Sequence, residues 1–250
     1  MKIKDQVILV TGANRGIGKG YVEEFLKGGA KKIYLAVRTP ESVKDIAAKN
    51  PGKIEVLKLD MTNPADIKSA AQKAKDTTII ISNAGVLEGG NLQDSDIVAR
   101  ARKEMEVNYF GPLALIQAFA PVLKSNGGGA FIGVSSIAGL IPFPAIATYS
   151  ASKAAMHFLI MEARMELSTQ GTKLFGVYPG PVDTDMARGF DMPKVTANHV
   201  ALETIKALET GIEDIMPDPY AVEHYNLYKK DPKATERNMQ SQYAEMTKAA

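Results

Sequence analysis

Three residues combine a hydroxyl, a phenol and an ammonium group at short spacing: Ser136, Tyr149 and Lys153. If Tyr149 lies near the start of a helix, Lys153 follows one turn later on the same face. An ammonium beside a phenol favours the phenolate, so we expect Lys153 to lower a phenol pKa that is ordinarily about 10. The phenol could then exchange a proton near neutral pH, while Ser136 holds a substrate oxygen. This trio suits hydride chemistry at a carbonyl, provided that the chain also binds a nicotinamide.

The N-terminal part of the chain has the pattern of a nucleotide-binding turn. An apolar run at 7–10 leads into Thr11-Gly-Ala-Asn-Arg-Gly-Ile-Gly18, and an amphipathic segment begins near Tyr21. Strand, glycine-rich turn and helix in this order place a pyrophosphate at a helix N-terminus, and glycines let the backbone approach the phosphates. The spacing is G-x-x-x-G-x-G rather than G-x-G-x-x-G. Alone this turn is weak evidence, because an ordinary strand–helix turn can carry the same glycines.

Several motifs in order make the chain resemble the short-chain dehydrogenase/reductase family over nearly its whole length. They are Thr11-Gly12-x-x-x-Gly16-Ile17-Gly18, Leu59-Asp60-Met61-Thr62, Asn83-Ala84-Gly85, Asn108 in Val-Asn-Tyr-Phe-Gly111, Ser136 with Tyr149 and Lys153, and Tyr178-Pro179-Gly180-Pro-Val182-Asp-Thr184. Tyr-x-x-x-Lys recurs at Tyr225 and Lys229 without these motifs before it. We interpret that second pair as residues on a solvated C-terminal helix.

The resemblance implies roles for individual residues. Tyr149 would give a proton to the substrate oxygen that Ser136 holds, and Lys153 would bind the nicotinamide ribose and tune Tyr149. Asn108, the remaining catalytic position, would hold a water that links Lys153 to solvent. The implied cofactor contacts are Gly12, Asn14, Arg15, Gly16, Ile17, Gly18, Arg38, Asp60, Met61, Asn83, Ala84, Gly85, Tyr149, Lys153, Pro179, Gly180, Val182 and Thr184.

Composition fits one cytoplasmic enzyme domain that spans residues 1–250. The 30 basic and 28 acidic residues give a net charge of +2, which gives no reason to expect a nucleic-acid or membrane partner. The chain has no cysteine, and its three histidines, His157, His199 and His224, lack metal-ligand spacing, so we expect no metal site. The N-terminus lacks the apolar region of a signal peptide, and no apolar stretch approaches the ~18 residues of a membrane span.

Alternating strand and helix patterns predict an α/β fold, a single Rossmann-type domain with a doubly wound parallel sheet of about seven strands and helices on both faces. The strand candidates are 6–10, 32–37, 54–59, 77–82, 130–135 and 173–178, with a short seventh at 213–216. Helices are expected at 64–75 and 96–123, among others. Residues that follow strands, such as Thr11, Arg38 and Ser136, should gather along one edge of the sheet.

Two segments depart from this plain pattern. Residues 183–194 carry scattered apolar side chains at the place where the family has a mobile substrate lid, and a surface loop is the alternative. The C-terminal tail, residues 217–250, is expected to form two polar helices, whereas many family members end on a seventh strand and a glycine-rich terminus. The helix after Tyr149 is apolar on more than one face, which favours burial in an interface and hence a homodimer or homotetramer.

The end of the second strand bears on cofactor choice. Val37 stands where NAD-using relatives usually carry an acidic residue for the ribose hydroxyls, and Arg38 and Arg15 lie nearby. Two guanidinium groups can hold a 2′-phosphate, so the sequence predicts NADP(H) as the cofactor.

The positions expected around the reacting carbonyl are Val86, Leu87, Ile137, Phe143, Met186 and Phe190. These side chains offer no cation to a substrate carboxylate or phosphate, and an unpaired buried charge is costly. The sequence therefore predicts an NADPH-dependent carbonyl reductase or alcohol dehydrogenase for medium-sized, neutral, fairly apolar ketones or aldehydes. The alternatives are a 3-oxoacyl-thioester reductase and a non-catalytic nucleotide-sensing relative.

Overall fold

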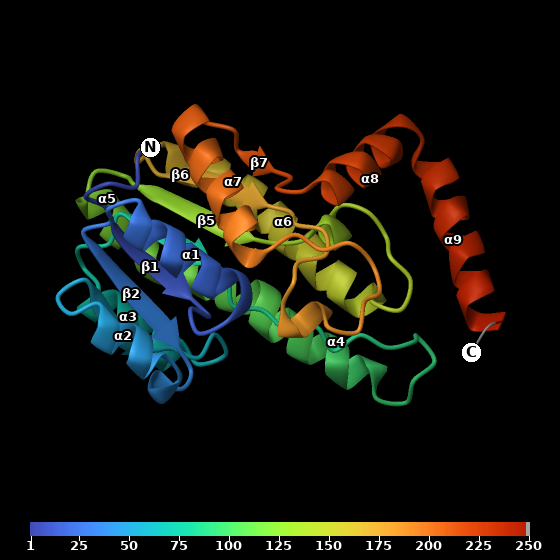
Figure 1. Cartoon of the computed structure of the whole chain (residues 1–250), viewed down its shortest axis with the longest axis horizontal. Coiled ribbons are helices and arrows are strands. Elements are labelled where there is room, and N and C mark those ends of the chain that lie inside the picture. The colour runs from blue at the N-terminus through green and yellow to red at the C-terminus, as the bar shows by residue number, and fades with distance from the viewer. Residues whose placement is uncertain (249–250) are drawn as a thin grey trace.

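A seven-stranded parallel sheet forms the centre of the protein, as seen in a computed structural model that describes residues 1–248 (Figure 1). The strands are β1 (Val7–Thr11), β2 (Lys32–Val37), β3 (Ile54–Lys58), β4 (Ile79–Ser82), β5 (Ala130–Val134), β6 (Lys173–Val177) and β7 (Asp214–Ile215). Their order is β3-β2-β1-β4-β5-β6-β7, so the winding direction reverses between β1 and β4. Ligands of such sheets bind beyond the carboxyl ends of the strands at this reversal.

Helices cover both faces of the sheet, as predicted. Alternate strand residues face opposite sides, so Ile8 and Val10 pack with helices α1 (Gly16–Lys27) and α7 (Ala197–Thr210). Val7 and Leu9 pack on the other side. That second layer contains α3 (Pro64–Lys73), α5 (Gly111–Ser125) and α6 (Ala147–Ser168). The short helix α2 (Lys44–Lys49) lies before β3.

The long helix predicted over 96–123 is interrupted in the structure. It consists of α4 (Ile97–Met105), a π-helical turn at Glu106–Phe110, and α5. A π turn fits an additional residue into the turn and rotates the side chains that follow, and such turns are frequent at functional sites. Periodicity alone does not reveal it, because the flanking segments keep the helical pattern. Asn108 lies in this turn.

The two atypical segments form elements of their own after β6 and β7. Residues 183–194 contain a short 3₁₀ turn at Asp185–Ala187, and a parallel bridge between Val182 and Val195 joins the two ends of this segment. The tail forms α8 (Pro219–Lys230) and α9 (Pro232–Lys248), which lie at one end of the molecule away from the sheet (Figure 1).

Helix α8 is less polar than the sequence suggested. Its Ala221 is buried in a small cluster with Ile137 and Ile141, and Tyr225 packs against that cluster. Lys229 lies 4.7 Å from the centre of the Tyr225 ring. Lys229 is exposed, as expected of a solvated helix, whereas Tyr225 is partly buried.

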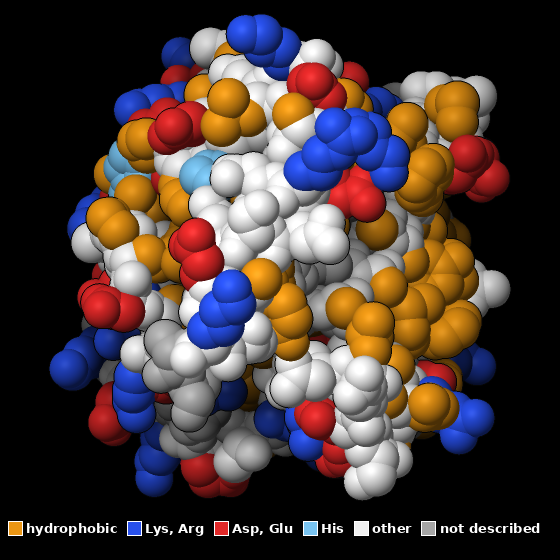
Figure 2. Space-filling view, turned by 90° about the vertical axis from the view of Figure 1, so that its right-hand side faces the viewer, with side chains coloured by type: hydrophobic (Ala, Val, Ile, Leu, Met, Phe, Trp, Pro, Cys, Tyr) orange, Lys and Arg blue, Asp and Glu red, His pale blue; other side chains and the backbone are white. Residues whose placement is uncertain are grey.

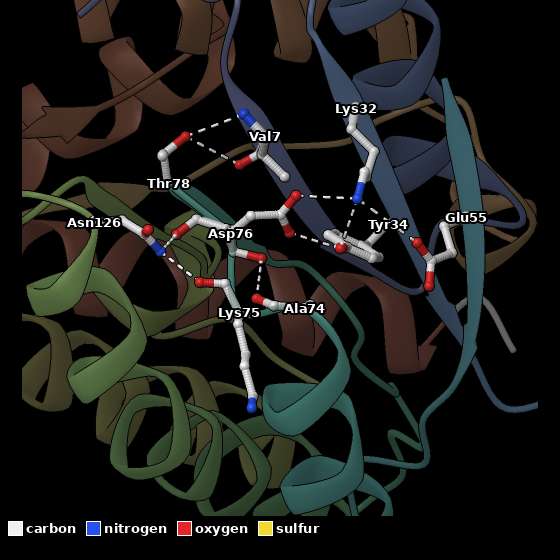
Figure 3. A network of polar contacts seen from close by, with 10 residues as sticks. Val7, Lys32, Tyr34, Glu55, Ala74, Lys75, Asp76, Thr78 and Asn126 are labelled. Carbon is white, nitrogen blue, oxygen red and sulfur yellow. Dashed lines mark hydrogen bonds and ion pairs between the residues drawn. The ribbon is translucent and has the colours of Figure 1, made fainter. Parts of the chain in front are cut away.

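A polar network closes the opposite edge of the sheet, where the strands begin (Figure 3). The hydroxyl of Tyr34 donates to Asp76 at 2.6 Å, and the ammonium of Lys32 donates to both Tyr34 and Asp76 at 3.0 Å. Burial alone would raise the pKa of Asp76, but hydrogen bonds from Tyr34 and Lys32 outweigh it and lower that pKa. This network ties β2 to the segment that enters β4.

Within the described residues, no helix is both long and apolar enough to cross a membrane. Nor do three or more His, Cys, Asp or Glu side chains gather there in a way that could hold a metal ion.

Candidate active site

The glycine-rich turn between β1 and α1 leaves open backbone at a helix N-terminus. Gly12 and Gly16 have φ angles of 65° and 52°, a region that side-chain-bearing residues rarely adopt. A β-carbon on Gly18 would lie 2.2 Å from the carbonyl oxygen of Gly12, so only glycine fits there. These residues form a tight cradle rather than an ordinary connection.

The N-terminus of α1 fits a phosphate group. Among the described residues no side chain caps this helix end, and its first turn contains no acidic residue. Free backbone N–H groups and the helix dipole both favour an anion at such a place. The chain therefore has the donor set that a dinucleotide pyrophosphate requires.

Thr11 fastens the glycine turn to the Asn83-Ala84-Gly85 segment. Its hydroxyl accepts hydrogen bonds from the backbone N–H groups of Asn83 and Ala84 at 2.9 and 3.0 Å. In return, the Asn83 side-chain amide donates to the carbonyl oxygen of Thr11 at 2.9 Å. Two motifs far apart in sequence are thus joined at the crevice between β1 and β4.

The residues at the end of β2 include a cationic side chain and no carboxylate. Val37 is buried as the last residue of this strand, and the next residue, Arg38, is exposed. Burial alone would raise the pKa of Asp60, but hydrogen bonds from Thr62 outweigh this effect and lower that pKa. The charge of the nearby Arg38 lowers it further. Met61 is buried beside Asp60.

Arg15 lies in the glycine turn, as the residue before α1, with its side chain 68% exposed. It pairs with Asp185 of the 183–194 segment at 3.5 Å. The two arginines predicted to hold a 2′-phosphate thus lie on separate segments, Arg15 before α1 and Arg38 after β2.

Ser136, Tyr149 and Lys153 come together as predicted. Tyr149 and Lys153 are buried one turn apart on α6, and the Lys153 Nζ lies 5.6 Å from the centre of the Tyr149 ring. Ser136 follows β5, and its hydroxyl lies close enough to the phenol to oppose the rise in the pKa of Tyr149. Ser135 fixes this arrangement, because its hydroxyl donates to the Lys153 carbonyl oxygen at 2.9 Å.

The expected pKa of the phenol was wrong for the chain on its own. Burial raises the pKa of Tyr149 to about 12, the nearby Ser136 hydroxyl opposes this rise, and the charge of Glu104 adds to it. Lys153 has no resolved effect on the pKa of Tyr149, and its ammonium donates to the Val134 carbonyl oxygen at 3.0 Å. Burial instead lowers the pKa of Lys153 to about 8.

Asn108 clamps the segment that follows Asn83-Ala84-Gly85. Its side-chain oxygen accepts from the Val86 N–H, and its amide donates to the Val86 carbonyl oxygen, both at 2.9 Å. The same amide donates to Ser152 on α6 at 2.9 Å. A β-carbon on Gly85 would lie 3.1 Å from Asn108 and 3.4 Å from Lys153, so this glycine lets both side chains approach.

The segment from Pro179 to Thr184 lies beside the same residues. The carbonyl oxygen of Pro179 accepts from the Ile137 N–H at 3.0 Å and from the Ser136 hydroxyl at 3.5 Å. A β-carbon on Gly16 would lie 3.1 Å from Thr184, which brings this segment against the glycine turn. Val182 is buried at the base of the 183–194 segment.

The predicted substrate residues occupy three segments near the trio. Val86 and Leu87 follow the clamped segment and are partly buried, Ile137 is buried after Ser136, and Phe143 is partly buried. Met186 and Phe190 are exposed on the 183–194 segment. Arg188, the cation that could reach inward, points to solvent with its side chain 81% exposed and pairs with Asp185.

The sequence did not point to two acidic residues at this site. Glu104 is fully buried on α4, and one of its oxygens accepts from the backbone N–H groups of Glu88 and Gly89 at 2.9 and 3.3 Å. Asp218 is buried before α8 and accepts from the Gly180 N–H at 2.7 Å. Neither residue lies in a recognisable motif, because each acts on backbone groups that only the fold brings to it.

Comparisons with known proteins agree with this geometry. A family model described as short chain dehydrogenase matches residues 6–193. A curated dehydrogenase/reductase SDR family member 7B of Danio rerio is 33% identical over 197 residues, which cover 74% of this chain and 63% of that protein. The chain thus spans somewhat less than two thirds of that relative. An uncharacterized oxidoreductase of Staphylococcus epidermidis is 30% identical over 83% of this chain and 92% of its own length.

Among solved structures, a short chain dehydrogenase from Burkholderia cenocepacia J2315 in complex with NADP is 38% identical. The match covers 96% of this chain and 99% of that one, with a TM-score of 0.90.

Proposed function

The chain belongs to the short-chain dehydrogenase/reductase family of oxidoreductases, and on that basis we propose that it is an NADP(H)-dependent carbonyl reductase for neutral, fairly apolar ketones or aldehydes. The observation that carries this proposal is the meeting of Ser136, Tyr149 and Lys153 beside an uncapped helix N-terminus. A protein that only senses nucleotides has no need of a proton donor and a substrate-oxygen ligand at this place.

In this proposal, different residues of the chain donate the proton, bind the substrate oxygen and hold the cofactor. The bound nicotinamide supplies the hydride. The Tyr149 phenol donates its proton to the carbonyl oxygen, and the Ser136 hydroxyl keeps that oxygen within reach of the phenol. Lys153 would hold the nicotinamide ribose, and Asn108 fixes the segment at Val86 that borders the substrate.

The high pKa of the phenol agrees with a preference for reduction in this scheme. Because burial keeps Tyr149 protonated at neutral pH, the phenol is ready to donate rather than to accept a proton. The reverse reaction, alcohol oxidation, requires the phenolate and is favoured by alkaline solution.

Two observations support NADP(H) over NAD(H). The end of β2 carries the uncharged Val37 followed by the exposed Arg38, so a 2′-phosphate meets a cation and no carboxylate at that position. The related Burkholderia structure holds NADP. A charge-assisted hydrogen bond to such a phosphate contributes about 1.5–3 kcal/mol.

The surroundings of the trio support a neutral substrate. The side chains predicted there are apolar, and the neighbouring Arg188 is exposed and paired with Asp185. An apolar site discriminates only weakly between similar substrates, so several ketones should react.

NADPH oxidation with a panel of neutral ketones, aldehydes, 2-oxo acids and 3-oxoacyl thioesters tests this function. We expect turnover of the neutral ketones and higher kcat/KM for a ketoester than for its free acid. Turnover confined to acyl thioesters would indicate the fatty-acid type of reductase, and NADPH binding without any turnover would indicate a sensor.

A homodimer or homotetramer in the cytoplasm also stays a prediction. The outer face of α6 supports an oligomer, because the apolar side chains of Phe158 and Met165 are 63% and 60% exposed there. Met156 and Ile160 on the same helix are buried. Light scattering of the purified protein would measure its oligomeric state.

A further inference from the structure

Helix α8 of the C-terminal tail is fastened directly to the segment that follows Tyr178. Asp218, only 4% exposed, accepts from the Gly180 N–H at 2.7 Å with one oxygen and from the Ala221 N–H at 2.9 Å with the other. A β-carbon on Gly180 would lie 2.7 Å from Asp218 and 2.9 Å from the Tyr220 ring. The tail therefore packs onto Gly180 without any space between them, and Pro179 beside it contacts Ser136.

This placement brings two rings of α8 next to Phe143. Tyr220 and His224 stack with their centroids 3.8 Å apart and their planes at 21°. Phe143, from the segment between Ser136 and Tyr149, stacks on Tyr220 at 6.3 Å and lies 6.4 Å from His224. The Nδ1–H of His224 donates to the Tyr220 carbonyl oxygen at 2.9 Å, which holds the imidazole in this position. All three side chains are only partly buried, so each keeps surface for a ligand.

The far end of the tail reaches the other side of the site. The hydroxyl of Tyr243 on α9 donates to the side chain of Asn91 at 2.8 Å. Asn91 follows Glu88 and Gly89, whose backbone N–H groups donate to Glu104. Figure 2 views the end of the molecule that carries α8 and α9, and shows a continuous patch of hydrophobic side chains beside a hollow in the surface. The tail thus bridges two segments that border the catalytic residues.

We propose that Phe143, Tyr220 and His224 form an aromatic wall of the substrate site that selects ketones with an aryl group next to the carbonyl. This proposal rests on the proposed carbonyl reductase function and names its substrate class. Aromatic rings attract one another in offset or edge-on arrangements at 4.5–7 Å beyond the effect of buried area alone, and a saturated ring of similar size lacks that contribution. Phe143 lies at such spacings from both Tyr220 and His224, so a planar aryl group extends the stack.

Acetophenone and cyclohexyl methyl ketone form a matched pair for the test, because they differ in the aromaticity of the ring. We would measure kcat/KM for both with NADPH in the unmutated protein and in Tyr220→Leu, Tyr220→Phe and Leu227→Ala. Leu227 lies on the same helix with half its surface exposed and outside the stack, so it controls for general effects on α8. We expect the aryl preference to fall about tenfold in Tyr220→Leu and to persist in Tyr220→Phe and Leu227→Ala.

The aromatic wall would be overturned if Tyr220→Leu left the ratio of kcat/KM for the two ketones unchanged. Failure to reduce either ketone would instead refute the proposed function. In that case the affinities of the two ketones, measured by calorimetry in the presence of NADP⁺, test separately whether the aromatic wall binds an aryl group. Tighter binding of acetophenone that Tyr220→Leu abolishes supports it, and equal binding contradicts it.

Discussion

Asn108 satisfies both backbone groups of Val86, accepting from its N–H and donating to its carbonyl oxygen at 2.9 Å each. This pairing joins a π-helical turn to the segment that borders the substrate. A buried backbone group that loses its partner costs about 1–3 kcal/mol. We therefore expect the proposed catalytic position and the shape of the substrate site to depend on this one side chain.

Replacing Asn108 with alanine should reduce both stability and turnover. We expect the free energy of unfolding in urea to fall by about 2 kcal/mol or more, with a large loss in kcat. Ser152→Ala is the matched control, since it removes the contact to α6, together with the bond from Ser152 to the Tyr149 carbonyl oxygen, and leaves both bonds to Val86. Equal effects of the two substitutions would contradict the importance of the Val86 clamp.

Arg38→Asp should reverse the choice of cofactor. The substitution removes one cation and places a carboxylate beside the expected 2′-phosphate, so kcat/KM for NADPH should fall by roughly 10- to 100-fold, whereas NADH is little affected. Lys49→Asp makes the same charge change at the end of α2 and should alter neither value. Equal kcat/KM for both cofactors in the unmutated protein would refute the NADP(H) prediction.

Alkaline pH should weaken the reaction through Lys153. Burial lowers the pKa of this ammonium to about 8, so the free protein loses the charge as the pH rises through that value. Because the pH dependence of kcat/KM reports groups of the free enzyme, kcat/KM for NADPH should decline above about pH 8. The phenol of Tyr149, with a pKa of about 12, stays protonated over the same range. A profile that is flat up to pH 10 would disagree with this assignment.

Much of this site could be predicted from sequence because its residues follow strands. The buried apolar strands end at or just before Thr11, Asn83 and Ser136. Parallel strands bring such ends to one edge of the sheet. Glu104 and Asp218 could not be found in this way, since their partners are backbone N–H groups whose approach depends on the packed tertiary structure. The pKa of Tyr149 was mispredicted because spacing reveals a neighbouring cation but not the depth of burial.

The network at the opposite edge should affect stability without affecting catalysis. Tyr34→Phe removes the bond to Asp76 and should cost about 1 kcal/mol in the free energy of unfolding at pH 7, with kcat/KM unchanged. The lowered pKa of Asp76 adds stability above the unfolded-state pKa of about 3.9, and this contribution is lost as the pH falls through the folded value. The variant should therefore lose less stability on acidification than the unmutated protein, and a parallel decline of both would argue against this role.

The most direct test of the proposed reaction is the rate of ketone-dependent NADPH oxidation by Tyr149→Phe. This substitution keeps the ring and removes the proton that we assign to the carbonyl oxygen. The account predicts a loss of roughly 10²–10⁴-fold in kcat, with the affinity for NADPH, measured by calorimetry, nearly unchanged. Full reductase activity in this variant would contradict the assignment of Tyr149 as the proton donor.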